Sequence, residues 1–195
     1  HVEVGATPLK TKYGWLLVYS HIQNYFPGAG ERIFGIEGIL MDIKDPFKLV
    51  GRTRGPILAP REPYELSGYV PNIVFPSGAL IKKDIWRKET LYIYYGAADT
   101  TVCVAHVNLP DLLHTMLKDK SDEWHFKRFE KNPIISPKPE HAWEATATFN
   151  PAAIRIGGVT HILYRTLAAD NTSYIGYAST KDGFNLTSRL DEPIY

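Results

Sequence analysis

The sequence predicts an all-β fold made of repeated sheets, because three strand-rich units recur along the chain. Each unit contains a run of β-branched and aromatic residues, and the three runs align on one tyrosine each: 15–20 with Tyr19, 91–96 with Tyr95, and 161–165 with Tyr164. A proline-bearing apolar segment precedes each run, and a further strand-like run with a turn follows it. The 195 residues allow about 65 per unit, which favours a β-propeller with about three blades here; a β-sandwich is the alternative.

One helix is predicted over residues 110–118. Pro110 stands near its first turn and Lys118 near its last, as helix ends prefer. Leucine and methionine recur at helical spacing on one face, at Leu112, Leu113, Met116 and Leu117. We expect this stripe to pack on the core and the charged stretch 118–123 to form a solvated connector.

Composition excludes several classes of protein. The chain carries 22 Lys and Arg against 21 Asp and Glu, a net charge of +1, so no nucleic-acid partner is expected. No apolar run approaches the ~18 residues of a membrane span and no signal peptide is visible, which predicts a cytoplasmic protein with no membrane partner. Cys103 is the single cysteine and cannot form an internal disulfide. No Cys/His cluster has metal-ligand spacing, so no metal and no organic cofactor are expected.

The ends of the chain predict a piece of a longer polypeptide. The sequence begins with His1 rather than Met, within an apparent strand, and closes at Tyr195 without terminal structure.

Three polar residues stand next to apolar strands and are candidates for ligand binding. Asp99 follows the small residues 96–98, which let a backbone and a ligand approach closely. Arg165 directly follows an aromatic strand, where a cation is costly unless it is paired or ligand-bound. Asn150 precedes a proline. A turn explains Asp99 and Asn150 equally well from spacing alone.

Four motifs together resemble glycoside hydrolase family 130, the β-mannoside phosphorylases and related β-mannosidases. They are Tyr-Tyr-Gly-Ala-Ala-Asp-Thr at 94–100, Gly-Trp-Leu-Leu-Val-Tyr at 14–19, the segments 64–68 and 74–78, and the segments 132–134 and 149–152. The resemblance implies a five-bladed propeller.

The order of these motifs differs from the family's order. Residues 1–120 resemble the C-terminal part of a family propeller, and residues 121–195 resemble its N-terminal part. The chain therefore resembles a junction of two tandem propellers or a permuted one. The resemblance also implies a catalytic Asp in a Glu-Asp-Pro-Arg-like motif, which does not occur in these 195 residues. The chain alone is expected to be an incomplete catalyst.

The resemblance also assigns the sugar and phosphate contacts. Asp99, Asn150 and Arg165 match residues that hold the mannosyl unit, which fits the hydrogen-bonding capacity of these side chains toward hydroxyls. Lys10 matches a phosphate-binding lysine. The family's phosphate-binding histidine directly follows the aligned tyrosine, whereas Ser20 intervenes before His21 in this chain.

The implied function is action on β-mannoside oligosaccharides. One reaction is phosphorolysis, with inorganic phosphate as co-substrate and mannose 1-phosphate as product. The other is inverting hydrolysis, which needs a second carboxylate as base, with Glu37 and Glu65 as candidates. A noncatalytic carbohydrate-binding propeller is the alternative from another class. Homo-oligomeric assembly is also expected.

Overall fold

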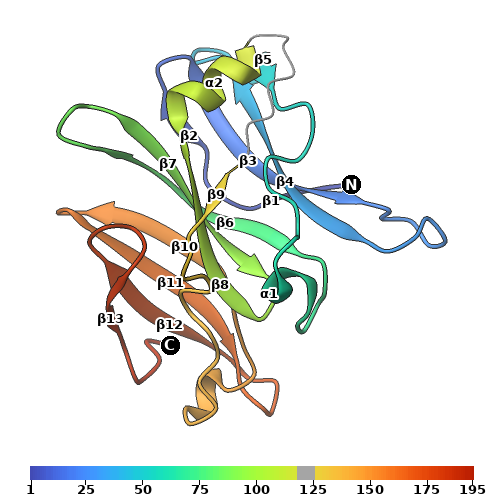
Figure 1. Ribbon diagram of the computed structural model, residues 1–195, viewed down its shortest axis with the longest axis vertical. Helices are drawn as coiled ribbons and strands as arrows, with labels where there is room; N and C mark the ends of the chain where they lie inside the picture. The colour runs from blue at the N-terminus through green and yellow to red at the C-terminus, as the bar shows by residue number, and fades with distance from the viewer. Residues whose placement is uncertain (118–125) are drawn as a thin grey trace.

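The computed structural model describes residues 1–117 and 126–195. Within these residues the chain forms three antiparallel sheets that follow one another in sequence (Figure 1). The first contains β1 (Val2–Val4), β2 (Leu9–Thr11), β3 (Gly14–Gln23), β4 (Ile33–Met41) and β5 (Leu49–Arg52). The second contains β6 (Val74–Lys83), β7 (Glu89–Ala97), β8 (Thr101–Asn108) and β9 (Lys127–Arg128). The third contains β10 (Ala147–Ile156), β11 (Val159–Leu167), β12 (Ser173–Thr180) and β13 (Leu186–Arg189).

This architecture confirms the predicted all-β fold with about three propeller blades. Strands hold 49% of the residues and helices 9%. The second and third sheets are up-and-down meanders from first strand to last, whereas in the first sheet β1 and β2 both pair with β3, and β4 and β5 follow in order. The three aligned tyrosines occupy one equivalent strand per sheet: Tyr19 on β3, Tyr95 on β7 and Tyr164 on β11. The repeat in the sequence is therefore a repeat of blades.

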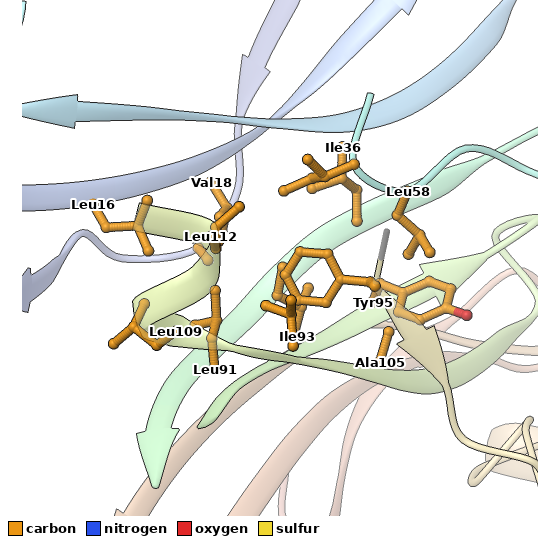
Figure 2. Close-up of a cluster of buried hydrophobic side chains, with 14 of the residues drawn as sticks. Leu16, Val18, Ile36, Leu58, Leu91, Ile93, Tyr95, Ala105, Leu109 and Leu112 are labelled. Atoms are coloured by element: carbon orange, nitrogen blue, oxygen red, sulfur yellow. The ribbon is translucent and has the colours of Figure 1, made fainter. Parts of the chain in front are cut away.

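The main core lies between the first and second sheets. Along β3 every second residue is buried, so Leu16 and Val18 face the second sheet. They pack with Ile93 and Tyr95 of β7 and with Leu112 of the helix that follows β8 (Figure 2). Burying a large apolar side chain stabilises the fold by about 1.5–3 kcal/mol, so this layer joins the two sheets firmly.

A second apolar cluster joins the second sheet to the third. It includes Tyr94 and Val104 on one side and Ile162 and Tyr164 on the other. The second sheet is thus covered on both faces, and β7 is buried continuously from Leu91 to Ala97. This explains why the run at 91–96 is apolar throughout rather than alternating.

The predicted helix is present as α2 (Leu109–Leu117). Asn108 caps it, with its Oδ1 accepting a hydrogen bond from the Asp111 backbone N–H at 3.1 Å. Leu112, Leu113 and Met116 are buried as expected, whereas Leu117 is 38% exposed. Lys118 and the predicted connector at 118–123 lie outside the described residues.

Two short helical turns each precede a sheet. They are α1 (Pro63–Leu66), before β6, and the 3-10 turn η1 (Ala142–Glu144), before β10. Each contains one fully buried glutamate, Glu65 or Glu144. Among the helices of the described residues, none is long and apolar enough to cross a membrane.

Candidate functional site

Asp99 lies in the tight turn that joins β7 to β8. Ala98 and Asp99 both adopt a φ of +47°, a left-handed conformation that is uncommon for residues with a side chain. The turn closes through a hydrogen bond from the Thr100 N–H to the Ala97 carbonyl at 3.0 Å. The buried part of β7 therefore ends in a turn of small residues, and this turn leaves the Asp99 carboxylate half-buried.

The neighbouring strand β10 is joined to this turn. Thr148 donates to the Thr100 carbonyl through its N–H at 2.9 Å and its Oγ1 at 3.2 Å. Two residues later, Asn150 lies in a β-bulge with φ +49° and an exposed side chain. Gly96 faces this bulge, and a Cβ on it would lie 3.5 Å from the Asn150 backbone nitrogen. The bulge thus presents Asn150 beside the end of β7.

Arg165 comes from β11, directly opposite Phe149. Its guanidinium lies 4.9 Å from the centre of the Phe149 ring, a cation–π arrangement. Its Nε and Nη2 donate to Ser173 Oγ at 3.1 and 2.9 Å. These contacts hold the cation near Asp99, close enough for its charge to lower the pKa of that carboxyl.

All three sheets contribute a charge at this end of the molecule. Burial raises the pKa of Asp99, the charge of Arg165 acts to lower it, and Glu3 of β1 raises it further, with a net upward shift. Glu3, Asp99 and Arg165 come from the first, second and third sheets respectively. The structure thus gathers Asp99, Asn150 and Arg165 in one region, where the second sheet meets the third. Sequence reasoning missed Glu3, whose only signal was its place at the start of the first unit.

Replacing Asp99 by Asn is expected to stabilise the fold at pH 7. The raised pKa means that the folded state disfavours the charged carboxylate, so stability falls as pH rises from the unfolded pKa through the folded one. Asn removes that cost and also tolerates a positive φ. We expect the melting temperature to rise by less than about 4 °C, since a half-buried carboxylate keeps part of its hydration. Thermal unfolding at pH 7 and pH 4 checks this: the gain should shrink at pH 4, and a loss of stability at pH 7 would contradict it.

Lys10, on β2, lies beside the start of β3, whereas His21 lies near the end of β3. Lys10 is exposed on β2 and pairs in register with Trp15, whose ring centre is 6.0 Å from its Nζ. His21 is six residues further along β3 than Trp15, which corresponds to about 20 Å at the usual rise of a strand. The structure therefore does not bring the two predicted phosphate ligands together.

Glu37 lies on β4 and pairs with residues of β3. Its Oε2 accepts a hydrogen bond from the Tyr19 hydroxyl at 2.8 Å, and its Oε1 lies 2.7 Å from His21 Nδ1. Burial and the Glu37 carboxylate raise the pKa of Tyr19 to about 12, so the phenol keeps its proton. Glu37 lines a cavity of about 760 Å³ beside β5. Both Glu37 oxygens are engaged in these contacts. The assignment of Glu37 as a catalytic base stays a prediction.

Glu65 is held in the interior by several donors. Its Oε1 accepts from the Tyr95 hydroxyl at 2.8 Å and from Arg128 Nε at 2.7 Å. Its Oε2 accepts from Arg128 Nη2 at 2.8 Å and from the backbone N–H groups of Arg61 and Glu62 at 2.8 and 3.0 Å. The side chain is 0% exposed, so this geometry favours a structural role over that of a base that activates water. Within the described residues, no group of three or more His, Cys, Asp or Glu is arranged to hold a metal ion.

Comparison with known proteins identifies the family. A sequence model of glycoside hydrolase family 130, described as beta-1,4-mannooligosaccharide phosphorylase, matches residues 1–118. The chain belongs to glycoside hydrolase family 130. The family-130 match ends before the third sheet, so the relation of residues 121–195 to the family's N-terminal part stays a prediction.

Individual relatives agree with this family. A 1,2-beta-oligomannan phosphorylase from Thermoanaerobacter sp. is 37% identical over 111 residues, covering 57% of this chain and 34% of the relative. The structure of a beta-1,2-mannobiose phosphorylase from Listeria innocua matches 59% of this chain and 30% of that protein at 33% identity, with a TM-score of 0.51. The family-130 chain thus spans about a third of the length of these relatives.

A more distant structure matches nearly the whole chain. Fructan 1-exohydrolase IIa from Cichorium intybus covers 99% of this chain, and the match covers 32% of that protein, with a TM-score of 0.60 and 16% identity. At this identity the likeness concerns the fold alone. It extends across all three sheets, and the structural neighbours are five-bladed β-propeller glycoside hydrolases.

Proposed function

We propose that this chain is part of a β-mannoside phosphorylase and supplies a large share of its sugar-binding surface. The observation that carries the proposal is the gathering of Asp99, Asn150 and Arg165 at one end of adjoining sheets in a family-130 chain. Arginine and asparagine donate to sugar hydroxyls, and a carboxylate accepts from two of them. The curated relatives are phosphorylases of β-mannosides, which supports the same substrate class here.

Phosphorolysis is favoured over hydrolysis by the two glutamates. An inverting hydrolase needs a carboxylate that can reach a water molecule. Glu65 is fully buried and both Glu37 oxygens are engaged, so neither offers an unoccupied carboxylate. Phosphorolysis is a glycosyl transfer to inorganic phosphate and needs no second carboxylate. The catalytic Asp that the family resemblance implies is absent from these 195 residues. We therefore expect turnover only from a longer polypeptide that includes this Asp.

Phosphate dependence tests the reaction. The full-length protein, given β-1,2- or β-1,4-mannobiose, should release mannose 1-phosphate only when phosphate is added. The Asp99→Ala variant should lower kcat/KM by at least about a hundredfold, since it removes a charge-assisted contact to the sugar and leaves Arg165 without its neighbouring anion. Release of free mannose without phosphate, abolished by Glu37→Gln, would instead establish hydrolysis.

Carbohydrate binding without catalysis is the second candidate function, because these 195 residues hold the proposed sugar contacts and not the expected acid. Saturable mannobiose binding, lost in Asp99→Ala, with no turnover by the full-length protein would establish it. We also propose a cytoplasmic location, which cell fractionation checks, and homo-oligomeric assembly, which light scattering checks.

A further inference from the structure

The second sheet is closed by a cluster of Tyr95, Glu65 and Arg128. Glu65 comes from α1, before the first strand of the sheet, and Arg128 from β9, its last strand. Arg128 donates hydrogen bonds to the Glu65 carboxylate from Nε at 2.7 Å and from Nη2 at 2.8 Å, and the Tyr95 hydroxyl donates to it at 2.8 Å. The Arg128 Nη2 also donates to the carbonyl of Ala59, in the segment that leads to α1. The cluster therefore fixes the preceding connector to the outer strand of the sheet.

The third sheet repeats this cluster with Tyr164, Glu144 and Arg189. Glu144 comes from η1, before the first strand, and Arg189 from β13, the last strand. Arg189 Nη2 and the Tyr164 hydroxyl donate to Glu144 Oε2 at 2.6 and 3.1 Å. Arg189 Nη2 also donates to the carbonyl of Ser136, in the segment that leads to η1, at 2.8 Å. The same three residue types make the same connection in both sheets.

Register shows that the first sheet has the equivalent arginine. In each sheet, the residue two positions before the aligned tyrosine pairs with a residue of the next strand. That second residue in turn pairs with an arginine on the outer strand. The three series are Ile93–Ala105–Arg128, Ile162–Ala178–Arg189 and Leu17–Ile39–Arg52. Arg52 therefore occupies the same register position relative to Tyr19 as Arg128 occupies relative to Tyr95.

The surroundings of Arg52 suit an incoming carboxylate. Arg52 lies near enough to Tyr19 for its charge to act on the pKa of that phenol. Both line the cavity of about 760 Å³, which also has Arg54, His21 and Glu37 in its wall. Glu37 already accepts from Tyr19 and pairs with His21. Arg52 therefore presents its guanidinium to an added carboxylate in a cavity where both Glu37 oxygens already have partners.

We propose that this cavity receives the carboxylate of a glutamate, and that Arg52 donates hydrogen bonds to this carboxylate. The glutamate would be carried on a short helical turn of additional polypeptide. The occupant is the counterpart of the turns that carry Glu65 and Glu144, and it would close the first sheet as those turns close the other two. Only 34% of the matched 1,2-beta-oligomannan phosphorylase aligns with this chain, so relatives contain further polypeptide that can supply such a turn. The arginine fork matches a carboxylate in two hydrogen bonds, which a lysine at this position would not reproduce.

A peptide added to the 195-residue chain tests the proposal. The peptide copies residues 136–147 and so carries Glu144 on its turn. NMR titration of the ¹⁵N-labelled chain should show saturable shifts at Arg52 and Tyr19. Changing Glu144 to Gln in the peptide, or Arg52→Gln in the chain, should weaken binding at least about tenfold, the worth of a charge-assisted hydrogen bond. Arg52→Lys should weaken it partly, and Lys48→Gln, in the exposed turn before β5, should leave it unchanged.

Three results would overturn the proposal. One is no saturable shift at Arg52 with the peptide in millimolar excess. Another is equal affinity for the Glu and Gln peptides. The last is binding of inorganic phosphate at Arg52 while the peptide does not bind, which would make the cavity an anion site for phosphate. Arg52 is exposed on an edge strand, so its variants are expected to keep the far-ultraviolet spectrum and melting temperature of the parent, which makes the affinity change attributable to the side chain.

Discussion

Replacing Glu65 by Gln should lower the free energy of unfolding by about 3–5 kcal/mol, the cost of leaving one partner of a buried ion pair without its counter-charge. Gln has nearly the same shape, so the loss would come from electrostatics rather than from a cavity. Arg128, with a side chain 11% exposed, would keep its charge opposite a neutral amide. The Gln side chain would also present an N–H₂ group where two backbone N–H groups now donate to Oε2.

Chemical denaturation at pH 7 measures the free energy of unfolding of the Glu65→Gln variant and of a matched control, Glu89→Gln. Glu89 pairs with Lys83 at 2.8 Å, but the lysine side chain is 65% exposed, so its loss should cost no more than about 1 kcal/mol. Similar losses in the two variants would contradict the structural role of Glu65. A Glu65→Gln protein that is fully stable yet inactive would instead restore Glu65 as a candidate base.

Replacing Gly176 by Ala should destabilise the third sheet by about 1–3 kcal/mol, the usual cost of overpacking a core. A Cβ at this position would lie 2.4 Å from Cζ of Tyr164, the residue that pairs with it across β11 and β12. The ring has little freedom to move, because its hydroxyl donates to Glu144 at 3.1 Å and accepts from Arg189 Nε at 3.1 Å. The new methyl group would therefore strain this cluster.

Thermal and denaturant unfolding of Gly176→Ala and Gly55→Ala provide the comparison. No atom outside its chain neighbours would lie within 4 Å of a Cβ on Gly55, so that variant should be neutral or slightly more stable. Unchanged stability of Gly176→Ala would mean that the tyrosine ring can yield, and that the cluster around Glu144 is less rigid than its hydrogen bonds indicate.

The local features of the fold could be predicted from the sequence. Aromatic and β-branched runs separated by turn residues located the main strands, and the aligned tyrosines identified the repeat. The stripe of Leu112, Leu113 and Met116 located α2, whose observed start is Leu109. These signals succeed because strand alternation, helical spacing and turn chemistry depend on residues a few positions apart.

The contacts that define the candidate site depended on pairings between distant parts of the chain. In the sequence, Glu65 is a carboxylate next to a tyrosine and is therefore a candidate base, whereas Arg128, which holds it in the structure, is 63 positions away. Glu3 received no role, since nothing near it in sequence points to Asp99. The resemblance assigns Lys10 and His21, only 11 positions apart, to phosphate, yet β2 folds back on β3 so that Lys10 lies beside Trp15.

The sequence by itself determined the strands, the helix, the three blade-like units and the family to which the first 118 residues belong. Tertiary structure alone decided which side chains meet: Asp99 with Arg165, Glu65 with Arg128, and Arg52 with the cavity beside Tyr19. The physical reason is that strand and turn preferences are local. A charged side chain, in contrast, acquires its partner and its burial only when sheets distant in sequence pack against one another.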